Sequence, residues 1–140
     1  MFDRDIYPSQ ENLYKGGYIM KDSKGSCDIT IFCSGSEVWV GLEVAEILSD
    51  YNIRVVNLSC WELFEEQSNS YKKSVIGSTD SLKVSIEAGV TIGWQKYTGI
   101  DGLNFGIDCF GESAPGKEVA KKLGLIPSTI AESIRTHLKQ

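Results

Sequence analysis

The stretch TIFCSGSEVWVG, residues 30–41, places an apolar segment directly before a turn of small residues and an amphipathic segment. This order predicts a buried strand, a turn at Gly35 and a helix that begins at Ser36, because serine side chains often cap helix N-termini. Units of this kind build α/β sheets. The stretch therefore decides the fold class, and it raises the question of whether the turn also binds a ligand.

Similar units lie along the rest of the chain. Apolar runs predict strands at residues 16–20, 28–33, 53–59, 82–89 and 103–108. Periodic segments predict helices at residues 36–50, from Ser113 and from Pro127, and residues 60–77 are compatible with a helix or with a loop followed by a helix. Strands that alternate with helices indicate a mainly parallel sheet covered on both faces. The first 15 residues show no periodic pattern, so we expect a flexible leader and one α/β domain over residues 16–140.

Composition excludes several classes of partner. The 140 residues carry a net charge of −5, which argues against a nucleic-acid surface, and no run of eighteen apolar residues predicts a membrane span. The sequence has no signal-peptide pattern, so we expect a cytoplasmic protein. Its four cysteines form no C-x-x-C pair, and the single histidine, His137, is distant from all of them, so we expect no metal site.

The turn of Ser34, Gly35 and Ser36 is a candidate anion site, because free backbone N–H groups and the positive end of the helix dipole point outward there. Its spacing differs from the known phosphate loops, since Leu42 stands where a P-loop has lysine and only Gly35 lies in the turn. A regulatory module that takes a nucleotide or another anion at this turn is one hypothesis. A plain helix start at Ser36 is the alternative that the local pattern favours.

Two carboxylates follow predicted strands. Glu87 comes just before Gly89 at the end of one strand, and Asp108 ends the last strand. Ligands of open α/β sheets gather beyond the carboxyl ends of strands, so either group could act as an acid, a base or a ligand. We favour structural, hydrogen-bonded roles, because no second titratable group of obvious use lies near them in the sequence. The local motifs therefore predict no catalytic set.

Aromatic residues offer a further possibility. Trp39, Trp61 and Trp94 could stack on a ligand, although such rings more often supply buried area in a core or at an interface. Trp94 and Tyr97 lie in the glycine-rich segment GVTIGWQKYTGIDG, residues 89–102. We expect these two rings at an interface.

Several stretches of the chain together resemble one family. They are KGGYIM at 15–20, SGSEV at 34–38, SCWELFEEQSNSYKKSVI at 59–76, VSIEAGVTIGWQKYTG at 84–99 and GIDCFGESAPGKEV at 106–119. In this collinear order, from about Lys15 to Leu138, the chain resembles the C-terminal domain of transketolase. The C-terminal domains of 2-oxoacid dehydrogenase β subunits and of deoxyxylulose phosphate synthase share the fold, but SIEAG followed by GWQKYTG and FGESAPG favours transketolase.

The resemblance implies both a fold and an activity of the whole enzyme. It implies a three-layer α/β/α domain with a five-stranded, mostly parallel mixed sheet, in which GGYIM forms the antiparallel strand. It also implies an enzyme of the pentose phosphate pathway that moves a two-carbon ketol unit between sugar phosphates. That reaction uses thiamine diphosphate and Mg²⁺, which the family holds in its other domains.

The residues that the family uses for chemistry have no counterpart here. The G-D-G…N diphosphate motif is absent, SQEN at 9–12 lacks the arginine of the family's S-R-Q segment, and Arg4 does not replace it. The resemblance thus implies a fragment without catalytic, cofactor-binding or metal-binding residues. Such a fragment would pack against the remaining transketolase domains and the second subunit of a homodimer. By analogy, Glu87, Gly89, Trp94 and Tyr97 would be contact residues between domains or subunits.

Overall fold

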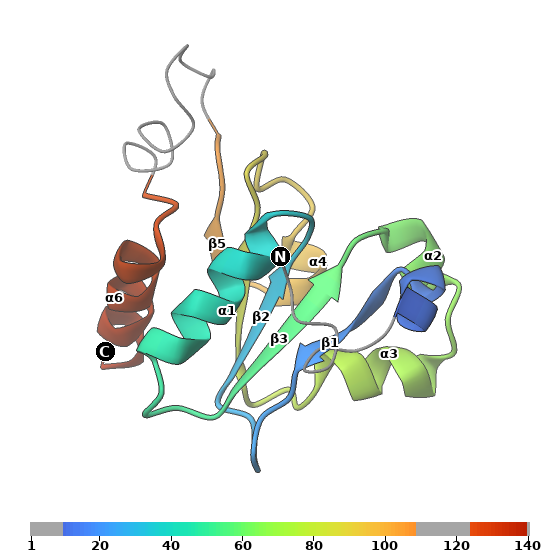
Figure 1. Ribbon diagram of the computed structural model, residues 1–140, viewed down its shortest axis with the longest axis horizontal. Coiled ribbons are helices and arrows are strands. Elements are labelled where there is room, and N and C mark those ends of the chain that lie inside the picture. Colours follow the sequence, from blue (N-terminus) through green and yellow to red (C-terminus); the bar gives the residue numbers. More distant parts are fainter. Residues whose placement is uncertain (1–9, 109–123, 140) are drawn as a thin grey trace.

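A five-stranded sheet forms the centre of the computed structural model, which describes residues 10–108 and 124–139 (Figure 1). Its strands, in the spatial order β1-β3-β2-β4-β5, are β1 (Gly17–Lys21), β3 (Ile53–Leu58), β2 (Ile29–Cys33), β4 (Leu82–Ile86) and β5 (Leu103–Phe105). Strands β2 to β5 run parallel, and β1 pairs antiparallel with β3, with Gly17 opposite Leu58. The predicted mixed sheet, with GGYIM as its antiparallel strand, is confirmed.

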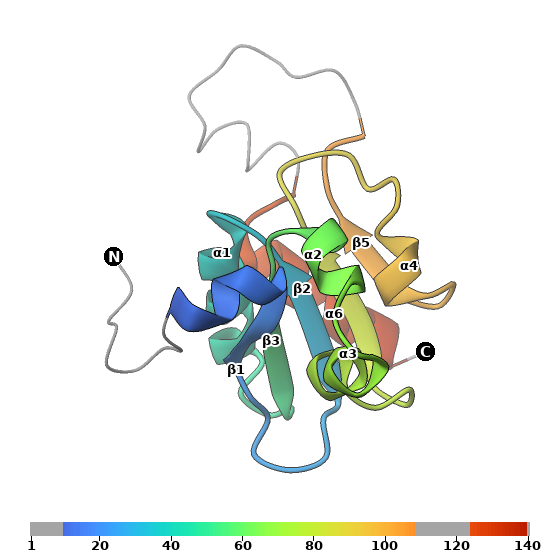
Figure 2. The same cartoon turned by 90° about the vertical axis from the view of Figure 1, so that its right-hand side faces the viewer.

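Helices cover both faces of this sheet. The described helices are η1 (Gln10–Lys15), α1 (Glu37–Ile47), α2 (Trp61–Glu65), α3 (Asn69–Ile76), α4 (Gln95–Thr98) and α6 (Pro127–Leu138). Helices α1 and α6 lie on one face, and α2, α3 and α4 lie on the other (Figures 1 and 2). The three-layer α/β/α architecture is therefore confirmed. In the described ranges, no helix is both long and apolar enough to cross a membrane.

Two apolar layers hold the helices to the sheet. All five residues of β2 are buried, as expected for a central parallel strand with helices on both sides. On the α1 and α6 side, Ile31 and Val55 meet Val44, while on the other side Phe32 and Val56 belong to a cluster with aromatic rings. Alternate residues of each strand thus serve opposite layers.

The structure departs from the sequence predictions at two helix starts. The segment 60–77 divides into α2 and α3, because the Ser68 hydroxyl accepts the N–H of Tyr71 at 3.2 Å and starts a new helix. Ser36 precedes α1 but makes no side-chain cap, and its Oγ donates to Glu37 instead. The helix predicted from Ser113 and the cysteine Cys109 lie outside the described residues. Residues 10–15 of the predicted leader form η1.

The chain enters the sheet through a tightly packed pair of glycines. Gly16 has a φ of +74°, and a Cβ placed there would lie 2.2 Å from the carbonyl oxygen of Cys60. The hydroxyl of Tyr71 donates to the carbonyl of Gly17 at 2.9 Å. Helix η1 is therefore fixed beside α2, at the end of the sheet where the parallel strands β2 to β5 finish.

Candidate functional site

Between β2 and β4 lies a topological switch point, where the chain stops adding strands on one side of β2 and begins to add them on the other. After β2 the chain passes through α1 to β3 on one side, and after α3 it crosses to β4 on the other side of β2. Ligands of open α/β sheets bind at such a point, beyond the carboxyl ends of the strands. The structure brings the turn at Ser34–Ser36 and the segment from Glu87 to Gly89 together here, because they follow the paired strands β2 and β4.

Hydrogen bonds at this edge join serine hydroxyls to carboxylates. Ser34 Oγ donates to Glu87 Oε2 at 2.6 Å, and Ser36 Oγ donates to Glu37 Oε1 at 2.8 Å. Burial, with smaller effects from the carboxylates of Glu37 and Glu87, raises the pKa of the Cys33 thiol at the end of β2. Their negative charge favours a hydrogen-bond donor or a cation at this turn over an anion. The anion hypothesis therefore gains no support from the geometry.

Asp108 ties the loop after β4 to the end of β5. Its carboxylate accepts the backbone N–H and the hydroxyl of Thr91, each at 2.8 Å. These two hydrogen bonds, the backbone one foremost, lower the pKa of Asp108. Ile107 N–H donates to the carbonyl of Gly89 at 2.7 Å and adds a second tie. Asp108 thus has the structural role that its position in the sequence suggests.

The rings of Trp94 and Tyr97 lie inside this chain. Trp94 is 3% exposed and Tyr97 is 5% exposed, so the expectation that these rings face a neighbour is not supported. Trp61 packs edge-on against both, with ring centroids 5.0 Å from Trp94 and 5.3 Å from Tyr97. Trp61 comes from α2, over thirty residues away, and it packs against the apolar cluster that contains both rings together with Phe32 and Phe64.

Sequence reasoning missed the role of Glu65. Its carboxylate accepts the hydroxyl of Tyr97 at 2.9 Å and pairs with Lys96 at 3.0 Å and Lys72 at 3.2 Å. These contacts, led by the hydrogen bond from Lys96, lower the pKa of Glu65 to about 2. Burial and this carboxylate together raise the pKa of Tyr97. Glu65 therefore joins α2, α3 and α4 into one layer.

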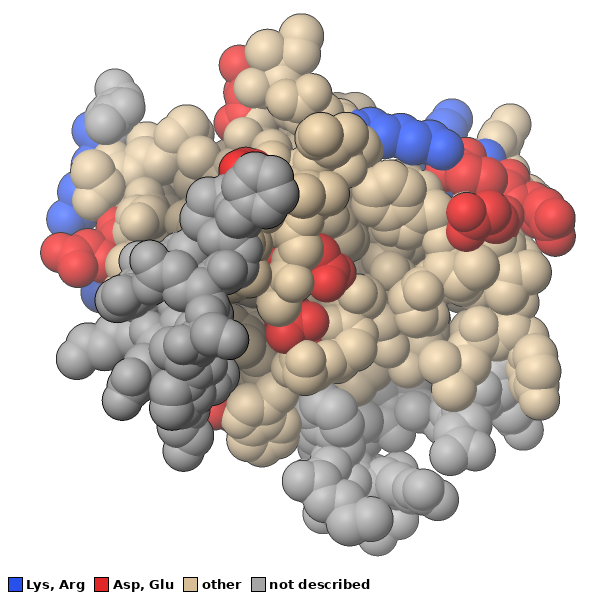
Figure 3. All heavy atoms as spheres, turned by 90° about the horizontal axis from the view of Figure 1, so that it is seen from above, with Lys and Arg blue, Asp and Glu red and all other residues tan. Residues whose placement is uncertain are grey.

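Apolar side chains gather around the same edge. Nine large hydrophobic side chains of the described residues are exposed, and six of them lie on elements that begin or end here: Leu13, Tyr14, Trp39, Leu63, Val90 and Ile92. Figure 3 looks onto this end of the molecule. Among the described residues in view, uncharged side chains fill most of the area, acidic groups lie both near the middle of this face and at its rim, and lysine and arginine side chains lie toward the rim. We call the six exposed apolar residues Leu13, Tyr14, Trp39, Leu63, Val90 and Ile92 the carboxyl-end patch.

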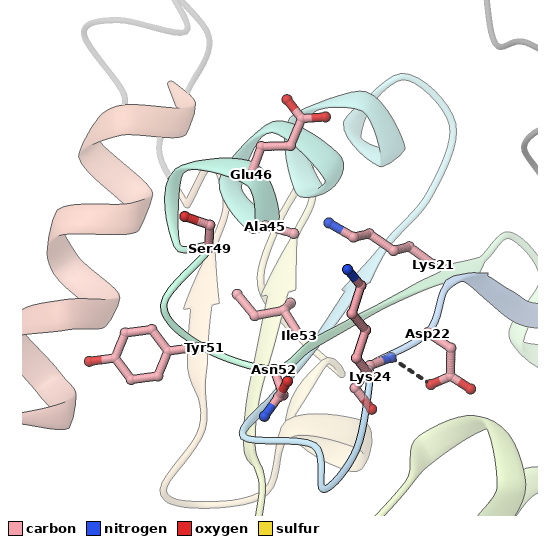
Figure 4. A pocket seen from close by; sticks show the side chains of 10 residues that line it. Lys21, Asp22, Lys24, Ala45, Glu46, Ser49, Tyr51, Asn52 and Ile53 are labelled. Carbon is pink, nitrogen blue, oxygen red and sulfur yellow. Dashed lines mark hydrogen bonds between the residues drawn. The ribbon is translucent and has the colours of Figure 1, made fainter.

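Two of the cavities among the described residues lie at the opposite end of the sheet and are lined in part by lysine side chains. One, of about 310 Å³, lies between the β1–β2 loop and the end of α1, and Lys21, Lys24 and Glu46 are among its lining residues (Figure 4). The other, of about 590 Å³, is lined in part by His137 and Lys83. The Lys83 ammonium donates to the carbonyls of Ser78 and Ser81 and to the Ser81 hydroxyl, so its donors are used within the chain. Across the described ranges, no three His, Cys, Asp or Glu side chains are grouped as metal ligands.

Comparison with known proteins gives one consistent result. A family model described as "Transketolase-like TK C-terminal domain" matches residues 16–126. The chain is 42% identical to transketolase of Aquifex aeolicus over 94% of its own length and 19% of that protein. It is 46% identical to transketolase of Dictyostelium discoideum over 83% of its own length and 17% of that protein.

Solved structures agree with this result. Transketolase from Leishmania mexicana matches with a TM-score of 0.85 and 33% identity, over 94% of this chain and 19% of that one. A chain described as a split gene transketolase, inactive β4 tetramer, shares the fold with a TM-score of 0.67 and 21% identity, over 99% of this chain and 46% of that one. The chain spans about a fifth of the length of the curated relatives that it matches.

Proposed function

This chain belongs to the family of transketolase-like C-terminal domains, and from that premise we propose that it serves an enzyme that transfers two-carbon ketol units between sugar phosphates. In that enzyme, which would act in the pentose phosphate pathway, thiamine diphosphate and Mg²⁺ supply the chemistry of the ketol transfer. This chain contributes an accessory domain that packs against the other domains and against a second subunit. The collinear match of most of the chain to transketolases is the observation that carries the proposal.

The edge of the sheet where ligands of this fold class bind does not fit a diphosphate. A diphosphate requires hydrogen-bond donors and positive charge. The side-chain donors of Ser34 and Ser36 are directed to carboxylates, and Glu37 and Glu87 place negative charge beside them. We therefore assign the binding of thiamine diphosphate, Mg²⁺ and sugar phosphates to other parts of the enzyme, and we assign no catalytic residue to this chain.

The carboxyl-end patch is the surface that we assign to the contact with those other parts. Ile92 is 83% exposed and Val90 is 59% exposed, and exposed apolar residues that cluster on one face are typical of interaction surfaces. Helix η1 lies at the same end, so the chain reaches β1 from the side of this patch. Glu87 and Gly89, at the base of the loop that carries Val90 and Ile92, keep their proposed role as contact residues on this face.

We also propose that the protein works in the cytoplasm, without a membrane or nucleic-acid partner. Cys27, Cys33 and Cys60 are free thiols, which is the usual state of cysteines in a reducing compartment. Separation of cell extracts into soluble and membrane fractions tests this location, and recovery in the membrane fraction would contradict it.

Assembly with the rest of a transketolase tests the contact surface. The chain is mixed with the portion of Aquifex aeolicus transketolase that precedes its C-terminal domain, and the complex is measured by analytical ultracentrifugation. Ile92→Asp places a charge in the patch and should weaken assembly at least about tenfold, because a buried charge without a partner is costly. Ile100→Asp is the matched control, since Ile100 is fully exposed outside the patch. Equal assembly of both variants would contradict the proposed surface.

A further inference from the structure

The cavity between the β1–β2 loop and the end of α1 holds two lysine side chains that share one space. Both side chains are exposed, and Figure 4 shows the ammonium groups of Lys21 and Lys24 turned toward each other among the residues that line the cavity. Neither ammonium has a hydrogen-bond or ion-pair partner among the residues that the structure describes. Two like charges that meet without a counter-ion repel each other, so an anion between them would be favourable.

A bulge in β1 brings Lys21 into this cavity. The register shifts between Ile19, which lies opposite Val56, and Lys21, which lies opposite Val55. In a regular strand Lys21 would share the face of Ile19, which packs toward α2 and α3. Because the bulge inserts one extra residue, Lys21 lies instead on the side of Ala45 and Ile53, which line the cavity below α1.

The carboxylate nearest to the lysines in the sequence is engaged elsewhere. Asp22 accepts Arg54 Nε at 2.8 Å and the backbone N–H of Ser23 at 2.8 Å. Arg54 also donates to the carbonyls of Ser74 and Val75 at the end of α3. The loop that carries Lys24 is thus anchored to the sheet, and the charge of Asp22 is balanced by Arg54.

Two sources of negative charge remain on the rim, and they do not cancel the lysines. The Glu46 carboxylate points away from the ammonium groups in Figure 4. The end of α1 has no basic residue in its last turn, and a helix C-terminus carries roughly half a negative charge. Together, the negative charges of Glu46 and of the helix end are smaller than the positive charge of the two ammonium groups. The site is therefore positive, although the protein as a whole has a net charge of −5.

We propose that Lys21 and Lys24 form a binding site for a phosphate group carried by a small molecule. Lysine binds phosphate as a compact point charge, and a cavity of about 310 Å³ has room for the group and a small organic substituent. The site lies at the opposite end of the sheet from the carboxyl-end patch, so a ligand could bind without displacing a partner from that patch. The proposal is thus independent of the proposed function.

Titration of the 140-residue chain followed by two-dimensional NMR tests this site. The ligands are inorganic phosphate and glycerol phosphate, each compared with chloride at equal ionic strength. Saturable shifts of the amide signals of residues 21–24 and 45–53 with the phosphates, but not with chloride, are expected. Equal effects of chloride, or the absence of saturable shifts, would overturn the proposal.

Charge variants make the test specific to the two lysines. Lys21→Gln and Lys24→Gln should each weaken phosphate binding about tenfold, as expected for the loss of one charge-assisted hydrogen bond. Glu46→Gln should strengthen binding, because it removes the negative charge on the rim. Lys73→Gln, at an exposed lysine of α3, is the matched control and should leave binding unchanged. Equal losses from Lys73→Gln and the cavity variants would overturn the proposal.

Discussion

Replacement of Glu65 should loosen the layer formed by α2, α3 and α4. The hydrogen bond from Tyr97 to this carboxylate contributes about 1.5 kcal/mol, and each of the two partly exposed lysine pairs contributes about 0.5 kcal/mol. Glu65→Ala should therefore lower the free energy of unfolding by about 2.5 kcal/mol. Glu65→Gln should lower it by about 1 kcal/mol, because the amide oxygen still accepts from Tyr97 while the charge is lost.

The same contacts make the contribution of Glu65 dependent on pH. Its pKa falls from an ordinary 4.5 to about 2 in the folded protein, so the stabilisation is complete above 4.5 and is lost as the pH falls through about 2. The side chain is 34% exposed, and solvent screening keeps the contribution well below what the pKa shift alone would give. Wild type and Glu65→Gln should thus differ at neutral pH and converge in acid.

Urea denaturation at about pH 7 and at about pH 2 measures this difference. Glu66→Gln is the matched control, because the neighbouring side chain is exposed, and it should change the free energy of unfolding by less than about 0.5 kcal/mol at either pH. A difference in the free energy of unfolding between wild type and Glu65→Gln that stays constant with pH would contradict this role of Glu65. Equal free energies of unfolding of the two proteins at pH 7 would contradict it as well.

Three further substitutions test the packing. Gly16→Ala should lower the free energy of unfolding, measured by chemical denaturation, by at least about 2 kcal/mol, because its Cβ would clash with the Cys60 carbonyl. Gly25→Ala, in open space, should leave that free energy nearly unchanged. Equal effects of the two substitutions would contradict the close contact at Gly16. Arg54→Ala should lower the free energy of unfolding by about 2 kcal/mol and speed amide hydrogen exchange in α3, because Arg54 holds the end of that helix. Unchanged exchange in α3 would contradict this role of Arg54. Trp94→Ala should lower the free energy of unfolding by about 3–5 kcal/mol and alter the near-ultraviolet circular dichroism of the aromatic cluster. A loss below about 0.5 kcal/mol, which is typical of a surface residue, would contradict the burial of the ring.

The sheet could be predicted because its signals are local. The apolar run that ends at Cys33, the turn at Gly35 and the periodic segment after it specify a strand, a turn and a helix within twelve residues. The antiparallel position of GGYIM required the family resemblance, since its five residues alone are compatible with either direction. The break between α2 and α3 depends on the side chain of Ser68. Its capping role is hard to recognise from the sequence, because the serine lies inside a long segment with a helical pattern.

The candidate site could be predicted only in part. The carboxyl edges of β2 and β4 were expected to gather ligands, and the structure places Ser34 and Glu87 there in contact. The negative charge at this edge belongs to Glu87, and the contact that holds Glu87 beside Ser34 joins side chains 53 residues apart. The burial of Trp94 depends in the same way on an apolar cluster from distant parts of the chain, and the orientation of Lys21 depends on a bulge that a period-two pattern does not reveal.

We propose above that this chain is an accessory domain of a ketol-transferring enzyme. The most direct test of this proposal is ketol transfer between sugar phosphates, with thiamine diphosphate and Mg²⁺ present. The assay compares this chain alone, the portion of Aquifex aeolicus transketolase that precedes its C-terminal domain, and the two together. We expect no transfer by the chain alone and more transfer by the mixture than by the Aquifex portion by itself. Ketol transfer by the purified chain alone would contradict the proposal.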